Sequence, residues 1–281
     1  MFWRAFIILL LVAGIFGGSA YFINELYFKE KKLDIIEQEA ASAPEPEPTP
    51  DPSIAAFEAI KGSIDSVSSA ARDALVAFLA EHPDSPRASD VRKAIGRINL
   101  ALLRNPETSP GTIAYTVKKG DSLVRIAAQN KSNAELIYWA NELPNINLQI
   151  GQQLIVPSFD GSLVVDRAKN TVTLFNNGEF FREYPAVSMK LSGQAASGEV
   201  DAKVADRVAR KGEARVAFGH KDYADAERFI LLSPGAVTLR PPAPVAEDGT
   251  VPPAPAGIVL APEDFIEIFV LVKTGIPVTI K

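Results

Sequence analysis

The chain has 281 residues, with 29 lysines and arginines against 34 aspartates and glutamates, and it contains no cysteine. The net charge of −5, without a basic patch interleaved with aromatic residues, argues against nucleic acid as a partner. The missing cysteine excludes disulfides, thiolate metal ligands, a cysteine nucleophile and a lipidated cysteine. The length suits about two ordinary domains, and no metal or cofactor is expected.

The N-terminal segment predicts entry into the export pathway. Ala5–Ile23 is an apolar run of about the 20 residues that cross a bilayer core. We therefore expect residues 1–28 to form a signal anchor, a transmembrane helix whose partner is the inner membrane. The alternative is a signal peptide cleaved at the small residues Gly18–Ala20, which would release a secreted protein.

Residues 29–53 are predicted to form a juxtamembrane and proline-rich linker. Prolines alternate with mainly acidic residues in Ala43–Pro52. Such a sequence favours a stiff polyproline II spacer on the order of 30 Å long. The linker would hold the following domains away from the membrane.

Residues 54–110 carry a helical pattern. Apolar residues recur at three- and four-residue steps through Ile54–Ala80, which predicts one amphipathic helix. Asp84–Pro86 supplies a cap and a first-turn proline for a second helix. The region resembles a tetratricopeptide helix pair, but one pair is too short for a repeat fold. We expect a helical hairpin that docks on a neighbour or self-associates.

Residues 114–158 carry the most informative pattern of the chain, a strand, two short helices and a second strand. Gly120–Ser122 forms a turn with a helix N-cap, for which Asp121 is the expected residue. Apolar residues at helical spacing follow, and Gly151-Gln152 leads into a closing apolar strand. The whole arrangement of strand, helix, helix and strand takes fewer than fifty residues.

This pattern closely resembles the LysM domain, a family that binds the N-acetylglucosamine chains of peptidoglycan and chitin. The matching residues are Tyr115–Val117, Gly120–Leu123, Ile126–Ala127, Trp139–Asn141, Leu143, Gly151–Gln152 and Leu154–Pro157.

In that family the ligand lies in a groove between the loop after the first strand and the loop before the second. The resemblance therefore implies a glycan-binding site at Gly120, Asp121, Ser122, Leu123, Asn145, Asn147, Leu148, Gln149 and Ile150. Each residue also has a structural alternative. Asp121 is expected to serve first as a cap, Leu123 partly as core and Gly120 as a turn residue.

Residues 161–281 read as a second domain rich in short strands. Strands are predicted at Ser162–Asp166, Thr171–Phe175, Phe180–Tyr184, Arg228–Leu232 and Ala236–Leu239, with Asn-Gly marking a hairpin turn between the second and third. A helix from Pro262 to about Val272 and a last strand at Ile276–Ile280 complete the chain.

This second domain resembles the L,D-transpeptidase catalytic domain, which cross-links peptidoglycan stem peptides through a cysteine thioester. Leu163–Asp166 with Tyr184–Ser188 resembles the family's first strands, and Gly257–Asp264 with Pro277–Ile280 resembles its end.

The departures from this family concern its catalytic residues. Arg240-Pro241 stands where His-Gly belongs, Gly257 where the cysteine belongs and Val259 where an arginine belongs. Thioester chemistry requires a thiolate and a base to activate it. The resemblance therefore implies an inactive domain, a pseudoenzyme with no catalytic residues.

Other catalytic chemistries find little support in the sequence. The two histidines, His82 and His220, fall in different predicted domains, which excludes a two-histidine zinc helix. A triad of Ser233, His220 and Asp222 lacks the Gly-x-Ser-x-Gly elbow around the serine. A carboxylate pair of the glycosidase type stays open, because the separation of the two groups depends on the fold.

The sequence thus predicts an α+β multidomain protein: an N-terminal transmembrane helix, a helical hairpin, a βααβ LysM module and a mainly-β L,D-transpeptidase-like domain. The predicted function is a membrane-anchored peptidoglycan-binding protein of the bacterial cell envelope, with the bulk of the chain in the periplasm or cell-wall space. Its partners would be glycan strands, the membrane, and a protein at the hairpin or C-terminal domain. The alternatives are an active cell-wall-modifying enzyme with an unrecognised site, or an envelope scaffold acting through the hairpin.

Overall fold

The computed structural model describes residues 3, 51–234, 237–244, 252–253 and 255–281. Pro52–Lys281 form one compact unit, separate from Met1–Asp51. Within the described ranges, no helix combines the length and apolar character needed to cross a membrane. The predicted membrane segment Ala5–Ile23, and most of the predicted linker, lie outside the described residues.

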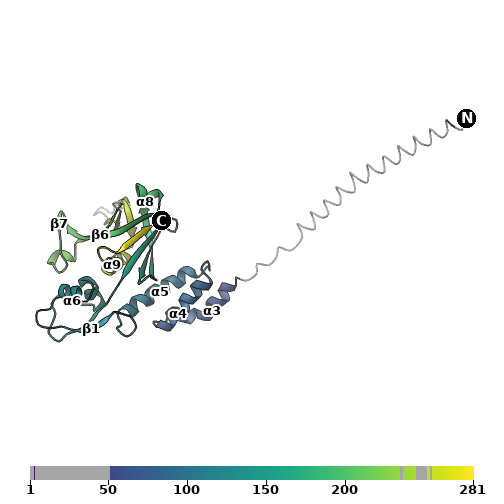
Figure 1. Cartoon of the computed structure of the whole chain (residues 1–281). Coiled ribbons are helices and arrows are strands. Elements are labelled where there is room, and N and C mark those ends of the chain that lie inside the picture. Colours follow the sequence, from purple (N-terminus) through teal and green to yellow (C-terminus); the bar gives the residue numbers. More distant parts are fainter. Residues whose placement is uncertain (1–2, 4–50, 235–236, 245–251, 254) are drawn as a thin grey trace. The chain divides into compact units, whose positions relative to one another are not determined.

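The region predicted as a helical hairpin contains three helices instead, α3 (Pro52–Ile64), α4 (Ser69–Glu81) and α5 (Ala88–Leu103), which lie side by side in Figure 1. The prediction of one helix over Ile54–Ala80 is wrong. The serine-rich connection interrupts it, because the Ser68 hydroxyl accepts a hydrogen bond from the Ala71 N–H at 3.1 Å and starts a new helix. The spacing of apolar residues alone does not reveal such a cap, since the helical periodicity continues across the connection between the two helices.

The predicted strand, helix, helix, strand module is present as β1 (Ile113–Thr116), α6 (Leu123–Gln129), α7 (Ala134–Ala140) and β2 (Gln153–Val156). The two strands pair antiparallel over the apolar faces of the helices. Ser122, and not Asp121 as expected, caps α6 by accepting a hydrogen bond from the Arg125 N–H. The module has a small hydrophobic core of its own that includes Leu123, Ile126, Ile137 and Leu154.

The C-terminal region is built on a single sheet. Its strands are β3 (Gly161–Asp166), β4 (Thr171–Asn176), β5 (Glu179–Lys190), β6 (Val200–Lys211), β7 (Ala214–Arg215), β8 (Glu227–Ser233), β9 (Thr238–Arg240), β10 (Gly257–Leu260) and β11 (Pro277–Ile280). The helices α8 (Gln194–Ser197), η2 (Lys221–Tyr223) and α9 (Pro262–Leu271) connect them.

This sheet closes on itself. In the described part of the chain, eight strands follow the order β11, β3, β4, β5, β10, β9, β8 and β6, and β6 pairs again with β11. The pairs β3–β11 and β9–β10 are parallel, and the other pairs in the ring are antiparallel. The apolar side of α9 joins the strand residues in one large core.

The predicted fold class is therefore wrong. The protein is a mixed α/β structure with an eight-stranded, barrel-like sheet, in place of an α+β chain with a helical hairpin and a mainly-β domain. Ring closure depends on the pairing of Pro277–Ile280 with both β3 and β6, which are far away in the sequence. Local patterns carry no information on such pairings.

The helices α3–α5 dock on the barrel at β5. Asn99 of α5 is 6% exposed and donates hydrogen bonds to the main-chain carbonyls of Phe180 and Phe181, at 3.2 and 2.8 Å. Gly96 permits close approach, because a Cβ there would lie 2.8 Å from Cγ of Arg182. This region therefore packs on the barrel of the same chain, and its predicted docking to a partner or self-association stays a prediction.

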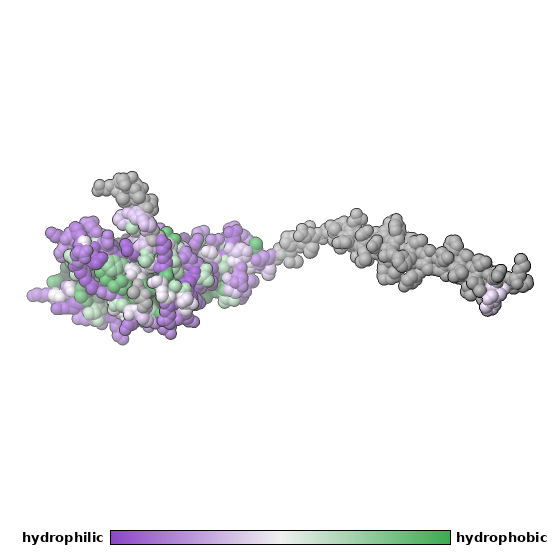
Figure 2. Space-filling view, turned by 90° about the horizontal axis from the view of Figure 1, so that it is seen from above, coloured by the Kyte–Doolittle hydropathy of each residue, from purple (hydrophilic) through white to green (hydrophobic). Residues whose placement is uncertain are grey.

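The β1–β2 module also packs on the barrel. The amide of Asn133 donates to the Val270 carbonyl at 2.6 Å, and the Lys273 ammonium donates to the Lys131 carbonyl at 3.0 Å. Figure 2 shows a mainly hydrophilic face on the described part, with hydrophobic residues in small separate patches. The large apolar side chains are therefore used chiefly for packing between and within these elements.

Candidate functional site

The structure brings together the two loops to which the sequence assigns the candidate site. Beyond the β1–β2 ladder, the Val117 N–H donates to the Gln152 carbonyl at 2.9 Å, and the Gly151 N–H donates to the Val117 carbonyl at 2.8 Å. Gly151 has φ +86°, a conformation that favours glycine. The loop after β1 and the loop before β2 therefore leave the sheet side by side.

The first loop is stabilised by the Asp121 carboxylate. It accepts hydrogen bonds from the Lys118 N–H at 2.8 Å and from the Tyr115 hydroxyl at 2.9 Å. The bond from the Lys118 N–H, together with the Tyr115 hydroxyl and the positive charges of Lys118 and Arg125, lowers the pKa of Asp121. Asp121 thus holds the loop in shape and stays ionised, which is a structural role.

The other predicted residues of this loop also have local roles. Gly120 has φ +85°, and its carbonyl accepts a hydrogen bond from Arg125 at 2.9 Å. Ser122 caps α6, and the Leu123 side chain is only 3% exposed in the module's core. A ligand would meet mainly the backbone here, together with Val124, which is 64% exposed and was not predicted.

The second loop is more open to solvent. Asn145 is exposed, and its side-chain oxygen accepts a hydrogen bond from the Asn147 N–H at 2.9 Å. The Gln149 N–H donates to the Gln152 side chain at 3.1 Å, and Leu148 packs partly on the module's core. Ile150 is 72% exposed. The two loops therefore present exposed aliphatic side chains beside polar backbone, while the contact role of each predicted residue stays a prediction.

At the predicted position of the nucleophile, the barrel has no room for a side chain. Gly257 begins β10 with φ +103°, and a Cβ placed there would lie 2.3 Å from the Thr238 carbonyl oxygen. All four residues of β10 are buried between β5 and β9. Val259 is paired with Arg240 in the sheet.

The alternative serine triad is not assembled. His220 and Asp222 lie at η2, before the Glu227 end of β8, and Ser233 lies at the other end of this strand. A seven-residue strand is about 20 Å long. The Nδ1 atom of His220 accepts a hydrogen bond from the Asp222 N–H at 3.2 Å, which is a local turn contact.

Comparison with known families confirms the module. Residues 115–157 match the model described as the LysM domain. The chain therefore contains a LysM domain at the place predicted from the sequence. No match is found among the curated protein sequences that were compared.

The chain is also similar to solved L,D-transpeptidase structures. For the enzyme from Mycobacterium smegmatis the TM-score is 0.30 at 14% identity, over 47% of this chain and 64% of that one. For the enzyme from Stackebrandtia nassauensis the TM-score is 0.31 at 10% identity, over 80% of this chain and 89% of that one. For a mutant L,D-transpeptidase from Enterococcus faecium the TM-score is 0.28 at 12% identity, over 65% of this chain and 81% of that one. Similarities this low carry no argument about activity.

Proposed function

We propose that the protein binds peptidoglycan glycan strands through its LysM domain. The observation that carries this proposal is the LysM match at residues 115–157, together with the two adjoining, solvent-exposed loops of that domain. The two loops combine exposed aliphatic groups with backbone donors and acceptors. An N-acetylated sugar presents the complementary groups, namely a methyl, an amide and hydroxyls.

The proposal includes a supporting, non-catalytic role for the barrel. The chain has no cysteine, and Gly257 leaves no space for a nucleophilic side chain at the corresponding strand. The barrel instead packs against both the α3–α5 helices and the LysM domain. Such packing would hold the glycan-binding loops on a rigid body.

We further propose that the protein works in the cell envelope, attached to the membrane. The support is the apolar sequence Ala5–Ile23 and the location of the polymer that a LysM domain would bind. Fractionation of cells, with and without a high-salt wash, tests the attachment. Recovery of the chain in the cytoplasmic fraction contradicts it.

Co-sedimentation with purified sacculi tests the glycan proposal. Deleting the LysM domain is a poor variant, because the domain packs on the barrel and its loss would expose apolar surface. We instead choose Ile150→Asp, which adds a charge to an exposed loop position. Val67→Asp is the control, since Val67 is 54% exposed in the α3–α4 connection. Weaker sedimentation of the first variant alone supports the proposal, and equal sedimentation of both contradicts it.

Incubation of the protein with tetrapeptide-containing muropeptides tests the proposal that the barrel has no catalytic role. No new cross-links or cleavage products are expected over the control without protein. Product formation that increases with protein concentration would overturn the non-catalytic role. It would leave the glycan proposal unaffected, because the two assays share no readout.

A further inference from the structure

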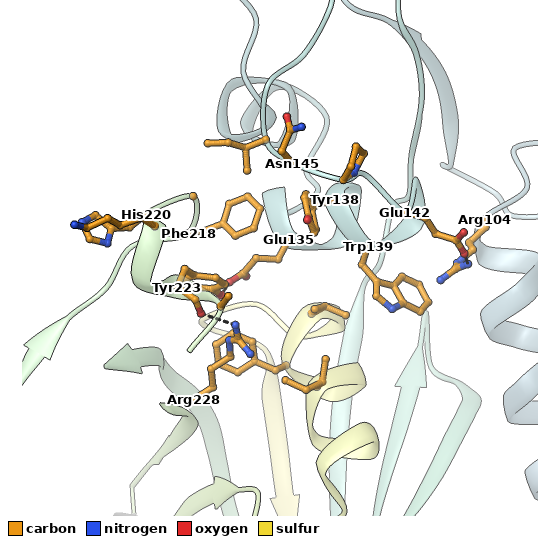
Figure 3. A pocket seen from close by; sticks show the side chains of 18 residues that line it. Arg104, Glu135, Tyr138, Trp139, Glu142, Asn145, Phe218, His220, Tyr223 and Arg228 are labelled. Carbon is orange, nitrogen blue, oxygen red and sulfur yellow. Dashed lines mark hydrogen bonds and ion pairs between the residues drawn. The ribbon is translucent and has the colours of Figure 1, made fainter. Parts of the chain in front are cut away.

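A cavity of about 840 Å³ lies between the LysM domain and the barrel (Figure 3). Its walls come from α7 and the loop after it on one side, and from η2, β8 and α9 on the other. This volume lies within the range of small-molecule sites, about 300–1,000 Å³. No predicted site residue except Asn145 lines it.

Aromatic side chains form much of this cavity. Phe218 packs edge-on against Tyr138 of the LysM domain at 5.7 Å between ring centroids, and against Tyr223 at 5.4 Å. Trp139 lies farther along α7, with the Arg104 guanidinium 3.9 Å from its ring centroid. Figure 3 shows these side chains around the cavity. Half-buried aromatic rings offer flat apolar surfaces suited to the C–H faces of a sugar ring.

Both glutamates that line the cavity have partners within the protein. Arg104 and Glu142 form an ion pair at 2.7 Å. Glu135 accepts hydrogen bonds from Arg207 and from the Tyr223 hydroxyl. Burial, and then the charge of Glu135, raise the pKa of Tyr223, which therefore stays a neutral donor. Arg228 also lines the cavity and donates a hydrogen bond to the Tyr223 carbonyl at 2.6 Å. These side chains supply hydrogen-bonding atoms for the hydroxyls and amide of an N-acetylated sugar.

The cavity is continuous with the second LysM loop. Asn145 and Ile146 line it, and Asn145 also belongs to the predicted glycan-binding loop. The barrel touches this loop directly, because a Cβ at Gly219 would lie 2.9 Å from Cδ1 of Ile146. A chain of sugars seated between the loops could thus continue past Asn145 into the cavity.

We propose that this cavity is an additional subsite for an N-acetylated sugar of the same glycan strand that the LysM loops bind. The inference rests on the proposed function and extends it, because the barrel then contributes Phe218 and Tyr223 to ligand binding. It also gives the barrel a binding role that needs no catalytic residue. Long oligomers should gain affinity from the cavity, whereas short ones held by the loops alone should not.

The test is calorimetric titration of the full chain with a trimer and a hexamer of N-acetylglucosamine. Ala224→Trp fills the cavity from an exposed position that lines it. Ala217→Trp is the matched control, since Ala217 is exposed in the same segment but does not line the cavity. Phe218→Ala removes a wall, and Ile150→Asp perturbs the loops. Circular dichroism of each variant serves as the control for correct folding.

We expect Ala224→Trp and Phe218→Ala to lower hexamer affinity about tenfold, as for a truncated aromatic anchor, and to leave trimer affinity unchanged. The Ala217→Trp control should bind both oligomers like the wild type. Unchanged hexamer affinity in Ala224→Trp overturns the subsite, while the LysM function stands if Ile150→Asp weakens both oligomers. If the wild type binds neither oligomer, the glycan-binding function and the subsite are both refuted.

Discussion

Adding a side chain at Gly257 should damage the protein and should not create an enzyme. In Gly257→Ala the new Cβ would lie 2.3 Å from the Thr238 carbonyl oxygen, a main-chain atom in the adjacent strand. The overlap can be relieved only by moving β9 or β10, and overpacking of this kind costs about 1–3 kcal/mol. The backbone at φ +103° adds about 1–3 kcal/mol for a residue that is not glycine.

Gly178→Ala separates these two costs. Gly178 has φ +79° in the β4–β5 turn, and a Cβ there would meet nothing within 4 Å. This control should lose only the conformational part, about 1–3 kcal/mol. Urea unfolding of the two variants should therefore differ by about 1–3 kcal/mol, with Gly257→Ala the less stable.

Equal destabilisation of the two variants would refute the steric argument, since it would mean that β10 adapts freely. Gly257→Cys extends the test to chemistry. It should be destabilised like the alanine variant, and it should form no cross-links with tetrapeptide muropeptides. A stable cysteine variant with transpeptidase activity would show that the strand retains a working site.

Three further substitutions test how the elements are held together. Asn99→Ala should lower the free energy of unfolding by about 1–3 kcal/mol in urea, because it removes the side-chain donor to the buried Phe181 carbonyl and the part-buried Phe180 carbonyl. Asn99→Asp, which cannot donate from its side chain, should not rescue the stability. Glu135→Gln should lower the free energy of unfolding by about 3–5 kcal/mol, because it leaves the Arg207 guanidinium, which is 14% exposed, without its charge partner. A decrease below about 1 kcal/mol would contradict this. Burial raises the pKa of Glu267, so the folded state binds its proton more tightly than the unfolded state does. The stability of the wild type relative to Glu267→Gln should therefore fall as pH rises from 4.5. A relative rise in stability, measured by urea unfolding at several pH values, would refute the assignment.

The LysM domain was predictable because its signals are local. Turn glycines such as Gly120, the Gly151-Gln152 pair and short apolar runs lie within 43 matched residues, and each specifies the backbone near itself. Even there, the local sequence does not decide which of two adjacent capping residues, Asp121 or Ser122, caps the helix. Asp121 bonds back to the Lys118 N–H, and Ser122 caps the helix.

The longest strands show where local patterns mislead. Val200, Val204 and Val208 of β6 recur every fourth residue, a spacing typical of a helix face. The segment is a strand because β8 and β11 pair with its two parts, and a register shift between Val204 and Asp206 changes which residues face the core. Only the partners far along the chain decide this outcome.

The sequence by itself determined the LysM domain, the absence of cysteine and the positions of most barrel strands. It did so because capping, turn conformation and residue chemistry act over a few neighbouring residues. The tertiary structure alone decided the ring closure through β11, the blocked position at Gly257 and the aromatic cavity between Phe218 and Trp139. Each of these depends on contacts between residues distant in sequence, whose pairing is selected by packing of the whole fold and not by any local preference.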